Sequence, residues 1–157
     1  MTDCDGVLTD AGVYYSEAGE QLKRFNLRDG MGVKRLRLMG IDTGIVTGEQ
    51  SQSLVRRAEK LGIEEVALGA RNKIQVVQAI AARRGLGAEA IAYIGDDVND
   101  REVLAWAGLS ACPHDAVGEI QKRVHLVLKT RGGHGVFREL AEIILEAQFP
   151  GQVLPVP

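Results

Sequence analysis

Short apolar runs alternate with amphipathic stretches along most of the chain, and glycines separate many of them. In the stretch 72–84, the apolar residues Ile74, Val77 and Ile80 recur at the spacing of one helix face. The pattern predicts strands at 41–47, 66–68, 90–94, 109–111 and 125–128. It predicts helices at 29–39, 50–61, 72–84, 99–107, 117–123 and 136–147. Strands that alternate with helices indicate βα units, so we expect a Rossmann-like α/β fold, a parallel sheet flanked by helices.

Capping residues support several of these boundaries. Asp29 and Asn72 stand where helices begin, and their side chains can accept hydrogen bonds from free backbone N–H groups. Gly40, Gly62 and Gly85 follow predicted helices, as expected of residues that end a helix in the left-handed conformation.

A β-hairpin is predicted at about 12–25, because two short segments flank a loop that contains Gly19. The rest of the pattern shows no linker and no repeat, so we expect one domain at 1–148. Residues 149–157 hold three of the four prolines and are expected to form a C-terminal tail.

Composition narrows the class of protein. With 45% hydrophobic and 25% charged residues, the chain of 157 residues is typical of a globular domain rather than a disordered one. We expect no membrane partner, because no apolar run approaches about 18 residues. A net charge of −2 gives no sign of a nucleic-acid partner. Two cysteines cannot build a disulfide framework, and the acidic start does not resemble a signal peptide, so a cytoplasmic location is expected.

Acidic residues gather where strands are predicted to end. Asp3 and Asp5 are two apart, so within a strand both side chains would point to one face. Asp96, Asp97 and Asp100 follow another predicted strand. Clustered carboxylates repel one another, and Mg²⁺ both relieves the repulsion and prefers oxygen ligands. Together the two groups predict a magnesium site.

Three further residues offer what a phosphate group needs. Thr47 and Gly48 end a strand, and Lys73 opens a helix, so a hydroxyl, a backbone N–H and an ammonium are available. Taken singly, each of these residues, like each aspartate, is more often a turn residue, a helix cap or a solvated side chain. Their combination at strand ends favours a phosphate site.

These segments resemble the four ordered motifs of the haloacid dehalogenase (HAD) phosphatase superfamily. The motif residues are 3–10, 45–48, Lys73 and 95–100. Segments 25–32, 57–63 and 131–139 are similar to the capless subgroup that acts on 3-deoxy-sugar-acid phosphates. That subgroup includes 3-deoxy-manno-octulosonate 8-phosphate phosphatases and nonulosonate 9-phosphate phosphatases. The motif order also argues against a response-regulator receiver, in which the acidic pair precedes the threonine and the lysine.

The resemblance implies a role for each motif residue. Asp3 would be the nucleophile, and Asp5 would protonate the leaving oxygen and then deprotonate the attacking water. Mg²⁺ would be held by Asp3, the Asp5 backbone carbonyl and Asp96. Asp97 or Asp100 would orient metal-bound waters. The phosphoryl oxygens would be held by Thr47, Gly48 and Lys73.

The spacing of the motifs leaves no room for a separate cap domain. Either a neighbouring subunit closes the site or the substrate is large. The resemblance implies a homotetramer built through the hairpin, whose alternative is a simple decoration of the sheet edge. The loop Gly132–Gly135 either reaches the active site or is a plain turn before a helix.

Residues directly after Thr47-Gly48, and on the helix that follows, predict the substrate. Glu49, Arg57 and Lys60 resemble the nonulosonate branch, whereas the octulosonate enzymes typically carry Arg directly after Thr-Gly. We therefore expect a nonulosonate (KDN or N-acylneuraminate) 9-phosphate, with octulosonate 8-phosphate as the alternative. The same three residues could also form a solvated helix face.

The start of the chain leaves two interpretations open. Only Met1 and Thr2 precede Asp3, so either the chain start is trimmed or misassigned or the first strand is weakened.

The class of function also has an alternative. Instead of an enzyme, the chain could be a non-catalytic oligomerisation module, like the one fused to some acylneuraminate cytidylyltransferases.

Overall fold

The computed structural model describes residues 1–153, and residues 154–157, the end of the predicted tail, lie outside the described residues. A parallel sheet runs through the molecule in the order β4, β3, Thr2, β5, β6, β7. Its strands are β3 (Gly44–Val46), β4 (Glu65–Ala67), β5 (Ala92–Ile94), β6 (Leu109–Cys112) and β7 (Leu126–Val127). The sequence therefore predicted each of these strands, with ends that differ by a few residues.

The start of the chain lies at the centre of this sheet. Thr2 pairs in parallel with Ile45 on one side and with Ile94 on the other. Strand order reverses here, because the chain passes first to β3 and β4 and later to β5 on the opposite side. Open α/β sheets bind ligands at such a switch point, beyond the carboxyl ends of the strands.

The first strand is very short. The Thr2 N–H donates to the Gly44 carbonyl at 2.9 Å, and the Asp3 N–H donates to the Ile94 carbonyl at 2.9 Å. A groove of about 610 Å³ adjoins Met1 at the opposite, amino-terminal end of β3 and β5. The few residues ahead of Asp3 are thus anchored on both sides but fill little of the sheet's centre.

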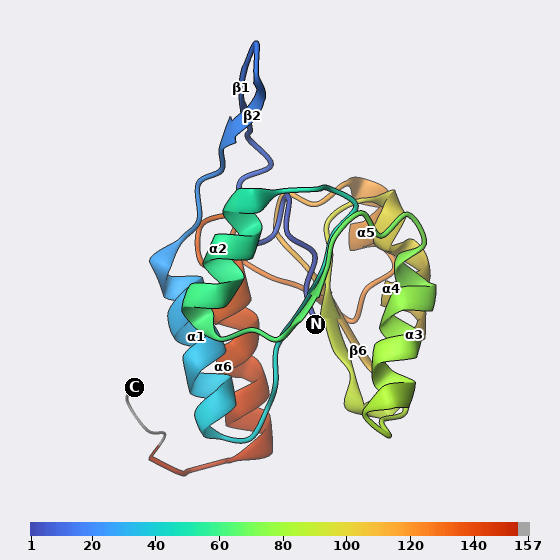
Figure 1. Cartoon of the computed structure of the whole chain (residues 1–157). Coiled ribbons are helices and arrows are strands. Elements are labelled where there is room, and N and C mark those ends of the chain that lie inside the picture. The colour runs from blue at the N-terminus through green and yellow to red at the C-terminus, as the bar shows by residue number, and fades with distance from the viewer. Residues whose placement is uncertain (154–157) are drawn as a thin grey trace.

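Helices cover both faces of the sheet (Figure 1). One layer holds α1 (Leu27–Leu38), α2 (Gln52–Leu61) and α6 (Val136–Gln148), and the other holds α3 (Lys73–Arg83) and α4 (Arg101–Trp106). Shorter helical segments are α5 (Gly118–Gln121), η1 (Ala88–Ala90) and η2 (Val98–Asp100). Buried aliphatic side chains such as Leu54 and Leu145 fill the first interface, and Val77 and Leu104 fill the second.

Helix ends show which caps form. Asn72 caps α3 as predicted, since its side chain accepts a hydrogen bond from the Gln75 N–H. Gly62 ends α2 in the left-handed conformation, also as predicted. The prediction that Asp29 caps α1 is wrong, because the helix begins earlier, at Leu27, with Asn26 as its cap.

Asp29 instead caps a different helix. It lies buried in the first turn of α1, and its Oδ1 accepts a hydrogen bond from the Arg138 N–H at 2.9 Å. The cap position of α6 is Gly135, which has no side chain to accept such a bond. One carboxylate on α1 therefore satisfies the amino-terminal end of the helix packed beside it.

The predicted hairpin is present as β1 (Tyr14–Ser16) and β2 (Gly19–Leu22), which pair antiparallel in a sheet of their own. It projects from the body of the molecule, and no cap domain accompanies it (Figure 1). Three large apolar side chains on it are exposed: Tyr14, Tyr15 and Leu22. Within the described residues, no helix combines the length and apolar character that a membrane crossing requires.

Candidate active site

The predicted motif residues meet at the carboxyl ends of the central strands. Asp3 follows the sheet position of Thr2, and Thr47 follows β3. Asp96 follows β5 after one glycine, and Asp100 ends the short helix η2. Lys73 is the first residue of α3. Residues nearly 100 positions apart in sequence thus surround one point, as the parallel topology predicts.

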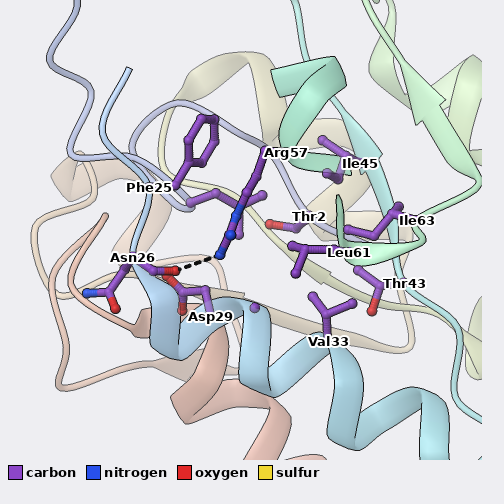
Figure 2. Close-up of a pocket in the computed structure, with 12 residues that line it drawn as sticks. Thr2, Phe25, Asn26, Asp29, Val33, Thr43, Ile45, Arg57, Leu61 and Ile63 are labelled. Atoms are coloured by element: carbon purple, nitrogen blue, oxygen red, sulfur yellow. Dashed lines mark hydrogen bonds between the residues drawn. The ribbon is translucent and has the colours of Figure 1, made fainter. Parts of the chain in front are cut away.

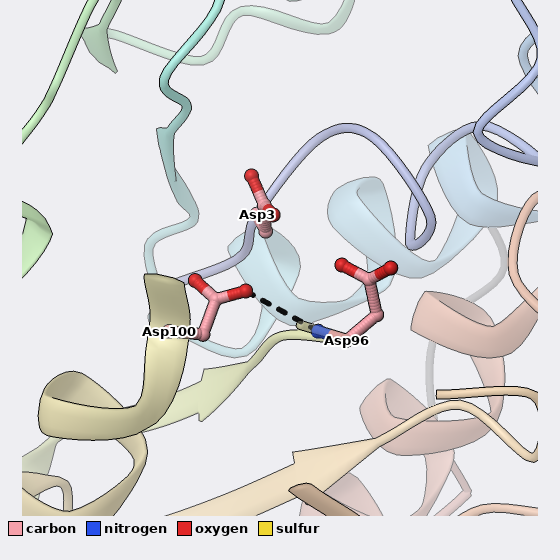
Figure 3. Close-up of side chains that lie close together, drawn as sticks. All are labelled: Asp3, Asp96 and Asp100. Atoms are coloured by element: carbon pink, nitrogen blue, oxygen red, sulfur yellow. Dashed lines mark hydrogen bonds between the residues drawn. The ribbon is translucent and has the colours of Figure 1, made fainter. Parts of the chain in front are cut away.

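Three aspartates form a compact acidic cluster, shown in Figure 3. Asp3, Asp96 and Asp100 each offer one carboxylate oxygen, and these three atoms lie within 4.8 Å of one another. Asp3 is 4% exposed and Asp100 is fully buried. Burial and the charge of Asp100 raise the pKa of Asp3 well above its usual value. The same two causes raise the pKa of Asp96 to about 7.

One buried ammonium partly balances this cluster. Lys73 Nζ lies 2.8 Å from Asp3 Oδ2 and 2.8 Å from Asp100 Oδ1. Burial alone would lower the pKa of Lys73, but the two carboxylates outweigh it and the pKa is raised. When all three carboxylates are ionised, the cluster with its one ammonium carries a net charge of −2. A divalent cation would neutralise this charge.

Asp100 holds its neighbours in place. Its Oδ1 also accepts a hydrogen bond from the buried Tyr93 hydroxyl at 2.7 Å, and its Oδ2 accepts one from the Asp96 N–H at 3.2 Å. Asp97, in contrast, is exposed, and its side chain accepts a hydrogen bond from the Val98 N–H at 2.6 Å. The sequence predicts that Asp97 or Asp100 orients metal-bound waters. Of these two residues, Asp100 is the one whose side chain lies in the acidic cluster.

Asp5 does not share a strand face with Asp3, so that part of the sequence prediction is wrong. The chain turns directly after Asp3, and the N–H groups of Val7, Leu8 and Thr9 all approach the Cys4 carbonyl. Gly6 allows the turn because it adopts a φ of +79°, a conformation that favours glycine. The side chain of Cys4 packs into the core.

The Asp5 carboxylate meets a lysine that sequence reasoning missed. Lys23, directly after β2, places its Nζ 2.7 Å from Asp5 Oδ1, and Thr9 Oγ1 donates to the same oxygen at 3.2 Å. The side chain of Lys23 is 3% exposed. The sequence holds no local signal for this pair, because the hairpin separates the two residues.

The glycine-rich loop Gly132–Gly135 packs against the turn that follows Asp5. The Gly133 N–H donates to the Val7 carbonyl at 2.8 Å, and a Cβ on Gly132 would overlap the Gly6 carbonyl. A Cβ on Gly6 would in turn overlap the carboxylate of Asp96. Glycines therefore allow this loop, the turn and the acidic cluster to stack closely.

Thr47 and Gly48 lie at the edge of the cluster, where β3 ends. Thr47 is buried, and its Oγ1 accepts a hydrogen bond from the Glu49 N–H at 3.2 Å. Gly48 and Glu49 are exposed. The backbone after Thr47 is therefore exposed at the carboxyl end of β3.

The remaining predicted substrate residues lie on α2, outside the acidic cluster. Arg57 Nη2 donates to the Asn26 carbonyl at 3.1 Å, and Figure 2 shows its side chain reaching toward the start of α1. It lines a cavity of about 10 Å³ together with Asp29 and Thr43. Lys60 is exposed. The structure therefore does not bring Arg57 into contact with the acidic cluster of Asp3, Asp96 and Asp100.

Comparison with known proteins agrees with the fold and the cluster. A sequence model of the haloacid dehalogenase-like hydrolases matches residues 60–140. The parallel sheet, the early hairpin and the absence of a cap define a HAD-type phosphatase of the capless subgroup.

Relatives narrow the class to a family. The 3-deoxy-D-manno-octulosonate 8-phosphate phosphatase KdsC of Yersinia pestis is 39% identical over 148 residues, which are 94% of this chain and 79% of that protein. The chain belongs to this family of sugar-acid phosphatases.

Two solved structures are similar throughout. The cobalt-bound deoxy-D-mannose-octulosonate 8-phosphate phosphatase of Haemophilus influenzae is 41% identical with a TM-score of 0.91, over 94% of this chain and 86% of that one. The Moraxella catarrhalis 3-deoxy-D-manno-octulosonate 8-phosphate phosphatase is 32% identical with a TM-score of 0.90, over 93% and 84%. That crystal structure contains a magnesium ion, a phosphate ion and a KDO molecule.

Proposed function

We propose that this protein is a Mg²⁺-dependent phosphatase that releases phosphate from 3-deoxy-D-manno-octulosonate 8-phosphate through an aspartyl-phosphate intermediate. The observation that carries the proposal is the largely buried cluster of Asp3, half-buried Asp96 and Asp100 around Lys73, at the switch point of the sheet. Its geometry joins a nucleophile, a cation site and a phosphate-binding ammonium in one place.

The donor set fits a magnesium ion. Asp3 and Asp96 would supply carboxylate oxygens and Asp5 its backbone carbonyl, which leaves positions for water and a phosphate oxygen. The pKa of Asp96 is raised to about 7 by burial and by the neighbouring carboxylates of Asp100 and Asp97, repulsion that a bound cation would relieve. When bound, the cation would neutralise charge on the phosphoryl group and bring it to the nucleophile.

Each residue then has one task. Asp3 Oδ attacks phosphorus, and Asp5 gives a proton to the sugar oxygen as it leaves. In the second step Asp5 takes a proton from the water that attacks the aspartyl-phosphate. Thr47, the Gly48 N–H and Lys73 hold the phosphoryl oxygens. Asp100 fixes Asp96 and Lys73 through the contacts described above, and Asp97 orients water at the outer edge.

The eight-carbon substrate is preferred because the relatives with that activity match 94% of the chain. The nonulosonate 9-phosphates predicted from Glu49 stay the second candidate. In favour of that candidate, Glu49 is exposed beside the open backbone of Gly48, where a substrate could meet it. Arg57 and Lys60, the other proposed substrate-binding residues, would then contact the sugar acid from α2, but Arg57 would first have to leave the Asn26 carbonyl.

We also propose a homotetramer in which a neighbouring subunit completes the site. The support is the projecting hairpin with its exposed Tyr14, Tyr15 and Leu22, together with the missing cap. Exposed apolar side chains of this size are typical of protein interfaces. A cytoplasmic location stays a prediction.

A purely structural module is the competing class of function. Such a module would gain nothing from two buried carboxylates and one half-buried carboxylate around one lysine, since burial of like charges destabilises the fold. The described residues retain the full set of motif side chains, which favours an enzyme.

A phosphate-release panel tests the proposal. The purified protein is assayed with Mg²⁺ on octulosonate 8-phosphate, on the 9-phosphates of KDN and N-acetylneuraminate, and on p-nitrophenyl phosphate. We expect the highest kcat/KM with octulosonate 8-phosphate. A preference for a nine-carbon substrate would instead support the prediction from Glu49, and no metal-dependent release from any sugar acid would refute the proposed activity.

A further inference from the structure

A chain of partly buried polar contacts joins the hairpin to the Asp5 carboxylate, whose side chain is 28% exposed. Ser51 Oγ, at the start of α2, donates to Glu20 Oε1 at 2.7 Å. Lys23 Nζ lies 3.5 Å from Glu20 Oε2 and 2.7 Å from Asp5 Oδ1. Ser51 is 1% exposed and the Lys23 side chain 3% exposed, so this is not a surface salt bridge. Contacts of this kind hold their members in one geometry.

The two oxygens of Asp5 have different surroundings. Oδ1 accepts from both Lys23 and Thr9, whereas Oδ2 is buried without a hydrogen-bond partner among the described residues. Two donors thus hold one oxygen of this carboxyl group and fix its orientation.

From this geometry we propose that Lys23 is a positioning residue for catalysis: it fixes the orientation of the Asp5 carboxyl group toward the leaving group of the substrate. The inference rests on the proposed function, in which Asp5 is the general acid. Glu20 contacts Lys23, and Ser51 donates to Glu20. The base of the hairpin therefore helps to hold the side chain that positions Asp5.

The chemistry makes the role measurable. In the first step Asp3 Oδ forms a bond to phosphorus, the bond from phosphorus to the leaving oxygen breaks, and its electron pair stays on that oxygen. A sugar oxygen then needs a proton from a correctly oriented Asp5, whereas p-nitrophenolate is a stable anion and leaves without one. The value of kcat/KM reports the steps up to this first departure, so it isolates the acid from the later attack of water.

The test compares Lys23→Met and Lys23→Arg with the wild type on both substrates, octulosonate 8-phosphate and p-nitrophenyl phosphate. Lys34→Met, an exposed lysine on α1, is the matched control. For Lys23→Met we expect kcat/KM on the sugar phosphate to fall at least about tenfold more than on the aryl phosphate, within the range that general acids contribute. Lys23→Arg keeps a cation and should recover part of the difference, and Lys34→Met should change neither value.

The ratio of the two kcat/KM values is independent of the fraction of folded enzyme, so partial unfolding of a variant does not obscure the result. An equal fall on both substrates would show a merely structural role and overturn the inference, as would no fall on either. Should Lys23→Met not fold, the same comparison on Glu20→Gln decides, with a smaller change of the ratio expected and an unchanged ratio contradicting the proposal. Failure of the wild type to hydrolyse any sugar phosphate would refute the proposed function itself.

Discussion

At the scale of single residues, the site is governed by a shortage of positive charge. Asp3, Asp96 and Asp100 converge on Lys73, and no second ammonium reaches this cluster among the described residues. Burial, together with the charges of Asp100 and Asp97, raises the pKa of Asp96 to about 7. A divalent cation and a proton therefore compete for the same oxygens.

This competition predicts a pH dependence of magnesium binding. Below about pH 7, Asp96 is protonated in the metal-free protein, so Mg²⁺ must displace that proton. Apparent affinity should fall by up to about tenfold for each pH unit below 7 and level off above it. Isothermal titration calorimetry from pH 5.5 to 8.5 measures this, and Asp96→Asn should weaken binding and flatten the curve. An affinity independent of pH would contradict the assignment of Asp96 as a ligand.

The sequence was sufficient to find the residues whose chemistry follows from local position. Asp3, Thr47, Lys73 and Asp96 each follow a strand or open a helix, so parallel topology alone brings them together. Lys23 could not be found in this way, because its partner lies 18 residues away across the hairpin. Lys23 becomes buried only because the hairpin brings it back to Asp5. The hydrophobic period of the sequence does not predict that tertiary contact.

At the scale of elements, one helix stabilises another through a buried carboxylate. Asp29 lies inside α1, yet its hydrogen bond goes to the Arg138 N–H of α6, 109 residues along the chain. Burial raises the pKa of Asp29 to about 6, although the backbone donors of α6 oppose this rise. Sequence reasoning took Asp29 for a cap of its own helix, because capping patterns are read locally and this contact is tertiary.

Substitutions of Asp29 should separate its hydrogen bond from its charge. Asp29→Ala removes the acceptor and should lower the free energy of unfolding by about 1–2 kcal/mol. Asp29→Asn keeps an oxygen acceptor and should lose less at pH 7.5. Urea denaturation followed by circular dichroism gives both values, and equal losses would argue against a capping role.

The pH dependence of the same variants tests the charge. The folded-state pKa of about 6 lies above the value of 3.8 in the unfolded chain, so the folded state binds the proton more tightly. The contribution of Asp29 to stability is therefore present at low pH and is lost as the pH rises toward 6. Relative to Asp29→Asn, the wild type should gain about 1 kcal/mol between pH 7.5 and pH 5.

The hairpin β1–β2 is the element through which we propose that subunits assemble. Tyr14 and Tyr15 are 65% and 69% exposed, on a two-stranded sheet that is not stabilised by the main sheet. We propose that the hairpin builds a homotetramer, so the double substitution Tyr14→Ser and Tyr15→Ser should give smaller species than the wild type in analytical ultracentrifugation. Activity on sugar phosphates should fall with it, whereas an unchanged molecular mass would contradict an interface at the hairpin.

At the scale of the whole molecule, the sheet order determines where chemistry can occur. Thr2 at the centre places Asp3 between β3 and β5, so the strands on either side contribute Thr47 and Asp96. The order of strands and helices was predictable from hydrophobic period and glycine spacing, and the fold class with it. The turn of the chain after Asp3 was not, because it arises from hydrogen bonds that converge on the Cys4 carbonyl.

The central claim is that Asp3 attacks phosphorus in a magnesium-dependent reaction, and the most direct test is phosphate release by the Asp3→Asn variant. We expect release from octulosonate 8-phosphate to fall at least about a thousandfold, as for loss of a nucleophile, while the oligomer and the circular dichroism spectrum stay unchanged. Glu64→Gln, an exposed acidic residue, should keep full activity, and EDTA should abolish release by the wild type. Full activity of Asp3→Asn with magnesium present would contradict the account.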